Sequence, residues 1–528
     1  MSRVAKSACK GCLLVMSCGR ECQTAHWSVH KVMCKSPLMK ESWKPKWVTE
    51  NRQPVFVGDG PPLKAFGGRK CLWGNVPAFD VLHLPENEGK EYDQDLKLLF
   101  AASGDLRNVE TTVVSMPPSY NRTITMVIND MDLDVVARNL FISLIALTVE
   151  DEISAAECML HLWYSALVRH KDVDLLTTRI RPLIEDVIGK IKSKAPGTVL
   201  GKTWQFGRRS LRLVLSKEGW TALLLYLEVP AGLSAERANQ IRTSVTLAPE
   251  PTDFRERKMV MCTPVQRFCG QHFRRDGILL PLGQSRETFT IPNPTMFQTA
   301  ECGCGLATND IYGKLYFHIH ALLVSFHQRV RQNDWHFQLL NVNAMQLPGQ
   351  MADAKFDRIE LSNIADGGYL GIRYIIGFLS PLLQDPGHNP HATLITLLMN
   401  AVMETGSSLR DGNEQAYKKE IDQVIAYLDK PARRPTSPYD PFAVLIMEST
   451  TLVRDTDAAF NKYMAQEDFK QIEKDFDVVM KKAHTVIEKW PMRLKLRPGQ
   501  KGAKEEFKAL LSSGHTNIER CVECRRTK

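Results

Sequence analysis

The sequence lacks the features that mark several large classes of protein. Its 13 cysteines among 528 residues are too few for a disulfide scaffold. The longest apolar runs, 140–149 and 393–402, are about ten residues long, whereas a membrane-spanning helix needs roughly 18 or more. The first residues reach cysteine without the apolar stretch of a signal peptide. We therefore expect no membrane partner and a reducing compartment, the cytoplasm or the nucleus.

Common catalytic motifs are also missing. The chain contains no G-x-S-x-G, no P-loop lysine motif and no H-E-x-x-H. These absences leave a hydrolase or an NTPase without support, and no catalytic residue can be named. The interleaving of aromatic and basic residues that is typical of RNA-binding surfaces is absent too.

Positive charge is concentrated at the two ends of the chain. Residues 1–50 carry nine Lys or Arg and three Asp or Glu, a net +6. Residues 481–528 carry thirteen and five, a net +8, so the total of +9 leaves 9 − 14 = −5 for the body. Basic ends can contact nucleic acid or acidic partners, or they can simply be solvated.

Five cysteines and two histidines crowd the first 34 residues. They are Cys9, Cys12, Cys18, Cys22, Cys34, His26 and His30. A tetrahedral zinc site needs four nitrogen or sulfur ligands, which often come in closely spaced pairs. In a reducing compartment such pairs bind metal rather than form disulfides. A chance cluster of buried thiols would need a core that so short a segment cannot build, so the spacing predicts zinc.

This segment resembles the MYND-type zinc finger, which holds two zinc ions in a cross-braced arrangement. Besides the cysteines, the resemblance rests on Gln23, Trp27 and Lys31. It implies one complete zinc site formed by Cys9, Cys12, His30 and Cys34. It also implies half of a second site, formed by Cys18 and Cys22.

The other half of the second site has no counterpart upstream of Cys9. Ser17 also stands where the family usually has an aromatic residue. Either the start of the chain is truncated, or Cys521 and Cys524, another C-x2-C pair, complete the site. A third interpretation makes that pair exposed thiols in a frayed tail.

A zinc site with four protein ligands leaves no open position for catalysis. MYND fingers bind short, often proline-rich peptides, so the resemblance implies a zinc-binding interaction protein with a peptide partner. Nucleic-acid binding through the basic ends is a separate hypothesis, which would require steep salt dependence.

The body begins with a strand–helix alternation. Strand-like runs over 96–103 and 123–129 are each followed by a helical pattern, over 106–114 and 133–148. This order predicts an α/β fold, the start of a Rossmann-like, doubly wound sheet. In such sheets, ligands bind at the carboxyl ends of the strands.

Later segments resemble the late motifs of class I S-adenosylmethionine methyltransferases. Residues 335–348 contain a polar-Ala pair before Leu-Pro, and residues 355–363 contain a Phe-Asp-x-Ile strand. The resemblance implies sites for S-adenosylmethionine and its substrate. The residues concerned are Gly104 at the first turn, Asp130 at the ribose, Asn343 near the adenine, and Asp357 and Asn363 beside the substrate.

The first turn argues against a bound cofactor. A cofactor turn favours several glycines so that the backbone can approach the ligand, yet residues 101–105 contain only Gly104. The Cβ atoms of Ala101, Ala102 and Ser103 would crowd a nucleoside. We therefore predict a non-catalytic scaffold, with a methyltransferase as the alternative.

Residues 73–165 carry longer motifs: WGNVPAFD, LLFAASGDLRNVETTV and INDMDLDVVARNLFISLIAL. Together they look like the domain of unknown function of fungal MYND-finger proteins, which also resembles the N-terminal part of a dynein axonemal assembly factor. The resemblance extends over most of residues 1–402. It implies membership but no activity, because that family has no assigned reaction.

The sequence divides into six parts. They are the finger (1–34), a linker (35–70), the Rossmann-like body (71–427) with a mostly helical insertion (150–330), a second proline-rich linker (428–442), a helical segment (443–490) and a basic tail (491–528). Within the insertion, 205–228 could form a helical hairpin or two strands. Cys302 and Cys304 precede His318 and His320, whose alternation suits core histidines or a metal site on a strand.

Overall fold

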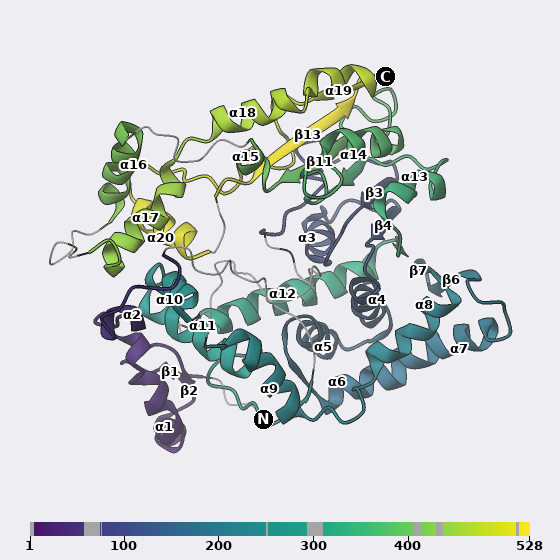
Figure 1. The fold of residues 1–528 in the computed structure, drawn as a ribbon. Coiled ribbons are helices and arrows are strands. Elements are labelled where there is room, and N and C mark those ends of the chain that lie inside the picture. Colours follow the sequence, from purple (N-terminus) through teal and green to yellow (C-terminus); the bar gives the residue numbers. More distant parts are fainter. Residues whose placement is uncertain are drawn as a thin grey trace.

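The computed structural model describes residues 5–57, 74, 76–249, 252–292, 310–405, 414–428, 435, 437–513 and 517–528. The fold is mixed α/β (Figure 1). None of the helices in these residues is long and apolar enough to cross a membrane.

A nine-stranded mixed sheet forms the centre of the molecule. In spatial order its strands are β12 (Val478–Met480), β13 (Arg520–Arg526), β11 (Thr393–Leu398), β10 (Arg358–Glu360), β3 (Leu96–Phe100), β4 (Ile124–Asn129), β9 (Trp335–Leu340), β7 (Arg209–Ser216) and β6 (Val199–Phe206). The six strands from β11 to β7 are parallel. Strand β13 is antiparallel to both of its neighbours, and β6 is antiparallel to β7.

Two small sheets and the helices complete the fold. The small sheets pair β1 (Ser7–Ala8) with β2 (Met16–Ser17) and β5 (Leu167–Arg169) with β8 (Phe289–Pro292). The α-helices are α1 (Arg20–Cys34), α2 (Lys46–Thr49), α3 (Arg107–Ser115), α4 (Leu133–Thr148), α5 (Glu152–Tyr164), α6 (His170–Leu175), α7 (Arg181–Ile191), α8 (Lys217–Ala222), α9 (Ala235–Thr246), α10 (Thr252–Val260), α11 (Pro264–Asp276), α12 (Ile311–Gln332), α13 (Leu347–Gln350), α14 (Ile372–Leu379), α15 (Ala401–Glu404), α16 (Glu414–Tyr427), α17 (Pro441–Val453), α18 (Asp457–Gln466), α19 (Phe469–Asp475) and α20 (Ala503–Ser513). Shorter 3-10 or π turns are η1 (Pro37–Met39), η2 (Leu176–Ile180), η3 (Leu223–Leu227), η4 (Ala344–Gln346) and η5 (Ser380–Leu382).

The central strands of the sheet are buried on both faces. Successive residues of a strand point to opposite faces, so Leu98 and Phe100 of β3 enter one apolar cluster and Leu99 enters another. The first cluster lies against α3, α4, α5 and α12, and the second against α14, α18 and α19. Burial on both faces explains why the central strands read as near-continuous apolar runs.

The early elements lie where the sequence predicts them. The predicted helix over 133–148 is α4, with the same bounds, and the predicted strand over 123–129 is β4. The chain passes from β3 through α3 to β4, and later from β10 through α14 to β11. Strands β4 and β10 flank β3, so the first connection moves away from β3 on one side and the second continues away from β3 on the other side.

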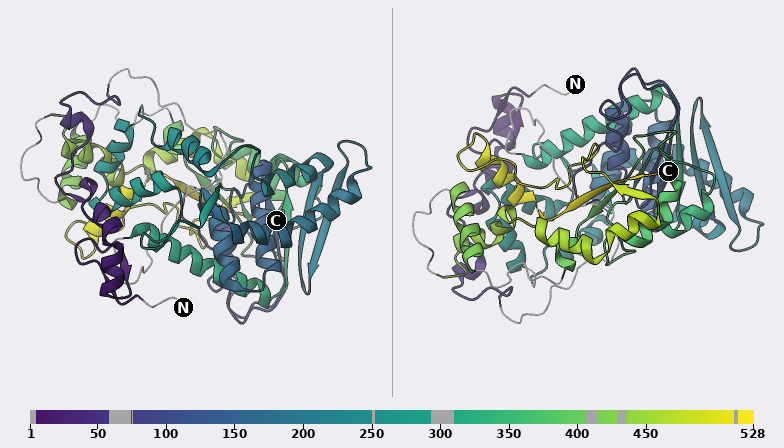
Figure 2. Two further views of the ribbon diagram at one scale, coloured as in Figure 1. Left: turned by 90° about the horizontal axis from the view of Figure 1, so that it is seen from below. Right: turned by 90° about the horizontal axis from the view of Figure 1, so that it is seen from above.

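The insertion is mostly helical, but it also extends the sheet. The segment 205–228 holds the end of β6, then β7, α8 and η3, so it forms strands and short helices in succession. The β6–β7 hairpin stands at one end of the molecule, and α16 and α17 stand at the other (Figure 2). His318 and His320 lie on helix α12 rather than on a strand. Cys302 and Cys304 lie outside the described residues.

The structure differs from the expectation of a loose basic tail over 491–528. This region contains α20 and β13, and β13 lies inside the sheet between β11 and β12. Val522 is 1% exposed and belongs to the second apolar cluster. The sequence does not predict this strand, because its charged residues suggest an exposed segment. In the structure Glu523 is buried, and backbone amides donate hydrogen bonds to its carboxylate.

The described part of the expected linker 35–70 is also anchored to the body. Trp47 is 1% exposed, and its Nε1 donates to the carbonyl of Tyr439 at 3.0 Å. Arg52 donates two hydrogen bonds to the carboxylate of Asp253, at 2.6 and 2.8 Å. A large aromatic side chain and a bidentate ion pair fix the path of this segment.

Candidate metal centre

Two of the predicted zinc ligands lie on a tight turn between β1 and β2. The amide of Leu13 donates to the carbonyl of Cys9 at 2.8 Å, and Leu13 has a left-handed φ of 54°. The turn brings Cys9 and Cys12 to the same side. Gly11 lies within the turn, where a Cβ would come within 3.3 Å of Cys34 Sγ, so glycine lets the turn approach the helix.

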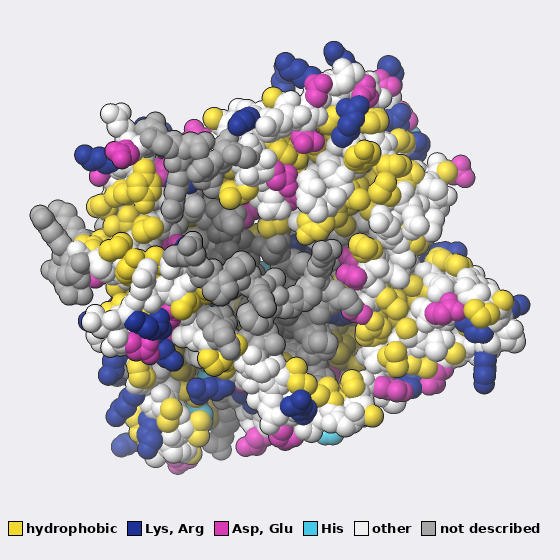
Figure 3. Space-filling model, viewed as in Figure 1, with side chains coloured by type: hydrophobic (Ala, Val, Ile, Leu, Met, Phe, Trp, Pro, Cys, Tyr) yellow, Lys and Arg dark blue, Asp and Glu magenta, His cyan; other side chains and the backbone are white. Residues whose placement is uncertain are grey.

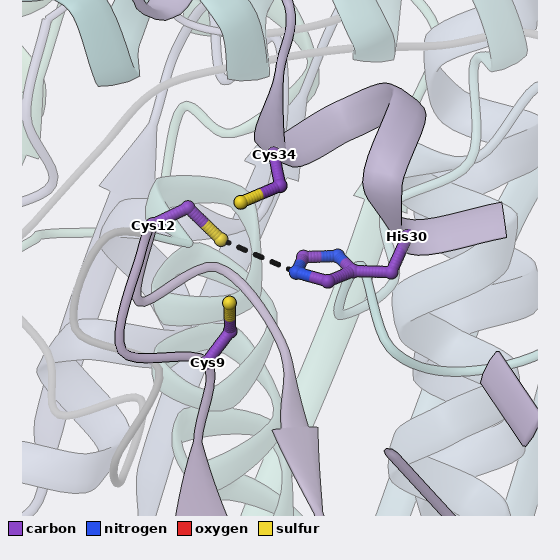
Figure 4. A group of neighbouring side chains, drawn as sticks. All are labelled: Cys9, Cys12, His30 and Cys34. Atoms are coloured by element: carbon purple, nitrogen blue, oxygen red, sulfur yellow. Dashed lines mark hydrogen bonds between the residues drawn. The ribbon is translucent and has the colours of Figure 1, made fainter. Parts of the chain in front are cut away.

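The other two ligands come from helix α1. His30 and Cys34 are four residues apart, so their side chains leave the same face of the helix. The ligand atoms of Cys9, Cys12, His30 and Cys34 all lie within 4.8 Å of one another (Figure 4). Cys12 Sγ lies 3.4 Å from His30 Nε2. Zn–S bonds of about 2.3 Å in a tetrahedron place ligand atoms about 3.8 Å apart, so this arrangement fits zinc.

The protonation behaviour of these groups suits a metal. Burial alone would raise the pKa of Cys9, but hydrogen bonds from Gly11 and Cys12 outweigh it and lower that pKa. Burial raises the pKa of Cys12 to about 12 and also raises that of Cys34. Burial, followed by the neighbouring His26, lowers the pKa of His30, which favours the neutral imidazole that binds metal. A zinc ion would supply the positive charge that the thiolates need.

The half-site predicted from Cys18 and Cys22 is separate from this cluster. Cys18 is half-buried and Cys22 is exposed. Within the described residues the four-ligand cluster is the only group of three or more such side chains close enough to hold a metal. Cys521 and Cys524 cannot complete the half-site, because both are buried in β13, paired with Leu397 and Leu394 of the central sheet.

The predicted cofactor residues fall at two different edges of the sheet. Gly104 and Asp130 follow the carboxyl ends of β3 and β4, and the Gly104 amide donates to Asp130 Oδ2 at 2.9 Å. Asn343 follows β9, is exposed, and accepts a hydrogen bond from the amide of Met345. Asp357 precedes β10 at the opposite edge, where the Lys97 amide and Asn389 Nδ2 donate to its carboxylate.

Asn363, the remaining residue predicted beside the substrate, follows β10 and is half-buried. It therefore lies toward the same edge as Gly104 and Asp130, whereas Asp357 does not. The structure thus does not bring the predicted cofactor and substrate residues into one group.

Comparison with protein families agrees with the geometry of the finger. Residues 2–34 match the model of the MYND finger family. This segment is a MYND finger. Residues 72–168, from the approach to β3 as far as β5, match a domain of unknown function (DUF4470). No curated protein and no solved structure matches the chain.

The ligands of the finger can be predicted from the sequence, but its attachment to the body cannot. Leu14 and Val15 are buried against Phe268 and Leu282, so the finger's turn rests on α11 and the segment after it. Arg267 reinforces this contact by donating to the carbonyl of Lys40 at 3.1 Å. Leu14 and Val15 form an apolar pair soon after Cys12, which is the one signal in the sequence for this contact.

Proposed function

We propose that this chain is a zinc-binding interaction protein whose MYND finger captures a short peptide from a partner protein. The observation that carries the proposal is the convergence of Cys9, Cys12, His30 and Cys34, whose ligand atoms lie within 4.8 Å of one another. A closed four-ligand site is structural rather than catalytic. The family match supports the interaction role, because MYND fingers generally mediate protein interactions.

The outer surface of the finger is open to a partner. Only His30 is buried among the 15 residues of α1. Val29 and Val32 are 58% and 70% exposed and turn away from the zinc ligands. Trp27 is 41% exposed. Apolar side chains held outward by a metal-fixed helix provide contact area for a peptide.

Selection of proline-rich and random peptides on the zinc-loaded full chain tests this proposal, followed by calorimetry of the selected peptides. The variant Val32→Asp should weaken binding by about tenfold or more, because it introduces a charge into an apolar contact. Val199→Asp is the matched control, since Val199 is 64% exposed on the distant β6. Binding that survives both Val32→Asp and removal of zinc would contradict the proposal.

We further propose that the body is a Rossmann-like, non-catalytic scaffold. The strand order β9-β4-β3-β10-β11 has the 3-2-1-4-5 pattern of doubly wound sheets, which supports this fold. The acid that would hold a ribose is bonded within the protein. Asp130 accepts the amides of Gly104 and Asp132, both at 2.9 Å, and burial raises its pKa.

S-adenosylmethionine binding remains the alternative for this edge. Calorimetric titration of the full chain with S-adenosylmethionine tests it, with Asp130→Ala as the comparison. The scaffold proposal predicts no saturable heat. Micromolar binding that Asp130→Ala abolishes would instead make the methyltransferase hypothesis primary.

We propose a site of action in the cytoplasm or nucleus, in keeping with the absence of disulfides among the described cysteines. Nucleic-acid binding through the C-terminal positive charge has less support than peptide binding. Arg520 is 4% exposed and pairs with Asp457, and Lys481 pairs with the buried Glu523. These two cations serve the fold, so they do not add to a basic surface.

A further inference from the structure

A cavity of about 250 Å³ lies against the sheet, far along the chain from the zinc ligands. Its floor is formed by β10, β11 and β13, and its cover by the irregular segments 76–79 and 486–492. The same face of the sheet is covered by helices near β3 and β4. Irregular segments in place of a helix leave space that close-packed side chains would otherwise fill.

The cavity opens at the point where the strand order reverses. Glu360, the last residue of β10, and Arg107, the first of α3, both line it, and β10 lies beside β3. In parallel α/β sheets, ligands bind outside the carboxyl ends of strands at such a reversal. The position therefore favours a ligand site over a packing defect.

Glu360 supplies a buried acid to this cavity. The residue is 5% exposed, and its Oε1 accepts the amide of Ser362 at 2.7 Å. No hydrogen bond to Oε2 is found within the described residues. Burial raises the pKa of Glu360 to about 7. A buried carboxyl group with one oxygen unused favours a ligand that donates hydrogen bonds.

The backbone beside Glu360 is strained. Ser362 lines the cavity with a φ of 50°, a left-handed conformation that is unfavourable for a residue with a side chain. The fold retains this conformation with a hydrogen bond from the amide of Leu397 to the Ser362 carbonyl at 2.9 Å. Strain of this kind is concentrated at binding and catalytic sites.

The charges around the cavity select the sign of the ligand. Arg107 pairs with Asp105, whose carboxylate lies 3.6 Å from its guanidinium, so these two charges offset each other. Glu488 also lines the cavity, and Lys495 offsets its charge at 2.7 Å. The acid of Glu360 is then the uncompensated group. The remaining walls include the apolar side chains of Phe79, Ile395, Val486 and Met492.

We propose that this cavity binds a small organic cation, an apolar body with one ammonium group that donates to Glu360. An ammonium ion satisfies the unused carboxyl oxygen and leaves the charges of Asp105, Arg107 and Glu360 balanced. An apolar body of one ring fits the volume and the walls. A carboxylate on the ligand would add a negative charge that these groups do not balance.

Three compounds with the same phenyl body test the sign of the charge. They are phenethylamine, phenylalanine and 3-phenylpropanoate, which are a cation, a zwitterion and an anion. The zinc-loaded full chain is labelled with methyl-13C methionine and titrated with each compound in NMR experiments. The methyl signal of Met492, which lines the cavity, reports whether the cavity is occupied, and the variant Met492→Leu assigns this signal. Met159 is fully buried in the first apolar cluster and does not line the cavity, so its signal is the internal control.

Phenethylamine should shift the Met492 signal saturably, phenylalanine should bind more weakly, and 3-phenylpropanoate should not bind. Glu360→Gln should weaken phenethylamine binding by about tenfold or more, because it removes a charge-assisted hydrogen bond. Ala78→Phe fills the cavity from its exposed rim, leaves Glu360 in place and should also abolish binding. Equal or tighter binding of the anion, or no shift with any compound, would overturn the proposal.

Discussion

At the scale of single residues, Glu110 opposes the stability of the fold. It lies fully buried on α3, and neither carboxyl oxygen has a hydrogen-bond partner in the described part of the chain. Burial, followed by the charge of Asp105, raises the pKa of Glu110 well above its ordinary 4.5. The folded protein therefore keeps a proton that the unfolded chain releases. The ionisation of Glu110 therefore costs the fold nothing below the unfolded pKa, and it lowers the stability of the fold increasingly as pH rises toward the folded pKa.

We predict that Glu110→Met increases the free energy of unfolding by about 1–3 kcal/mol near pH 7, the cost of an unsatisfied buried polar group. The gain should shrink toward pH 4, where the side chain is protonated in both states. Urea denaturation across this pH range measures both effects. Glu505→Met on the exposed face of α20 is the control and should change stability little at any pH. A gain that does not vary with pH would contradict this account.

Residue chemistry also decides what the sequence could reveal about the candidate sites. Zinc requires a few residue types at short spacing, so Cys9, Cys12, His30 and Cys34 stand out as a group in the sequence alone. Glu360 and Arg107 are separated by about 250 positions in the sequence. Nothing local connects these two residues. They come together because β3, the strand that precedes α3 in the chain, pairs with β10.

At the scale of elements, prediction succeeds where burial is uniform. Helix α4 and strands β3 and β4 are apolar over most of their length, so the sequence pattern and the burial agree. Strand β13, RCVECRR, reads as charged, yet its first five residues are buried. Its strand partners, β11 and β12, lie elsewhere in the sequence. The amides of residues 485–487 donate the hydrogen bonds that let Glu523 be buried.

The position of β13 leads to a prediction about the C-terminal region. Val522→Asp should lower the free energy of unfolding by several kcal/mol, about 3 or more, because it buries a charge between β11 and β12. Arg525→Asp is the matched control on the same strand, since Arg525 is exposed. Thermal unfolding followed by circular dichroism compares the two variants. A Val522→Asp protein as stable as the control would mean that β13 is not part of the folded sheet.

At the scale of the whole molecule, the apolar interior is divided among separate clusters. Two clusters cover the faces of the sheet, whereas Cys9, Leu14 and Val15 share a small third cluster with Phe268 and Leu282. In the space-filling view, the finger's corner of the molecule carries many Lys and Arg side chains (Figure 3). Because the third cluster is small, the finger contacts the body over a limited area. Its own fold depends on metal, because so short a segment cannot stabilise itself by burial.

Removal of zinc should therefore have a local effect. We predict that a chelator abolishes hydrogen-exchange protection over 5–34 and lowers it in α11, which loses its cover over Phe268. Protection in β3 and β4 should not change, because these strands are buried in the sheet clusters. Cys34→Ser should reproduce this pattern without chelator, while Cys22→Ser, outside the four-ligand cluster, should leave the finger protected. If the chelator also removed protection from β3 and β4, the finger would instead be part of one cooperative unit with the sheet.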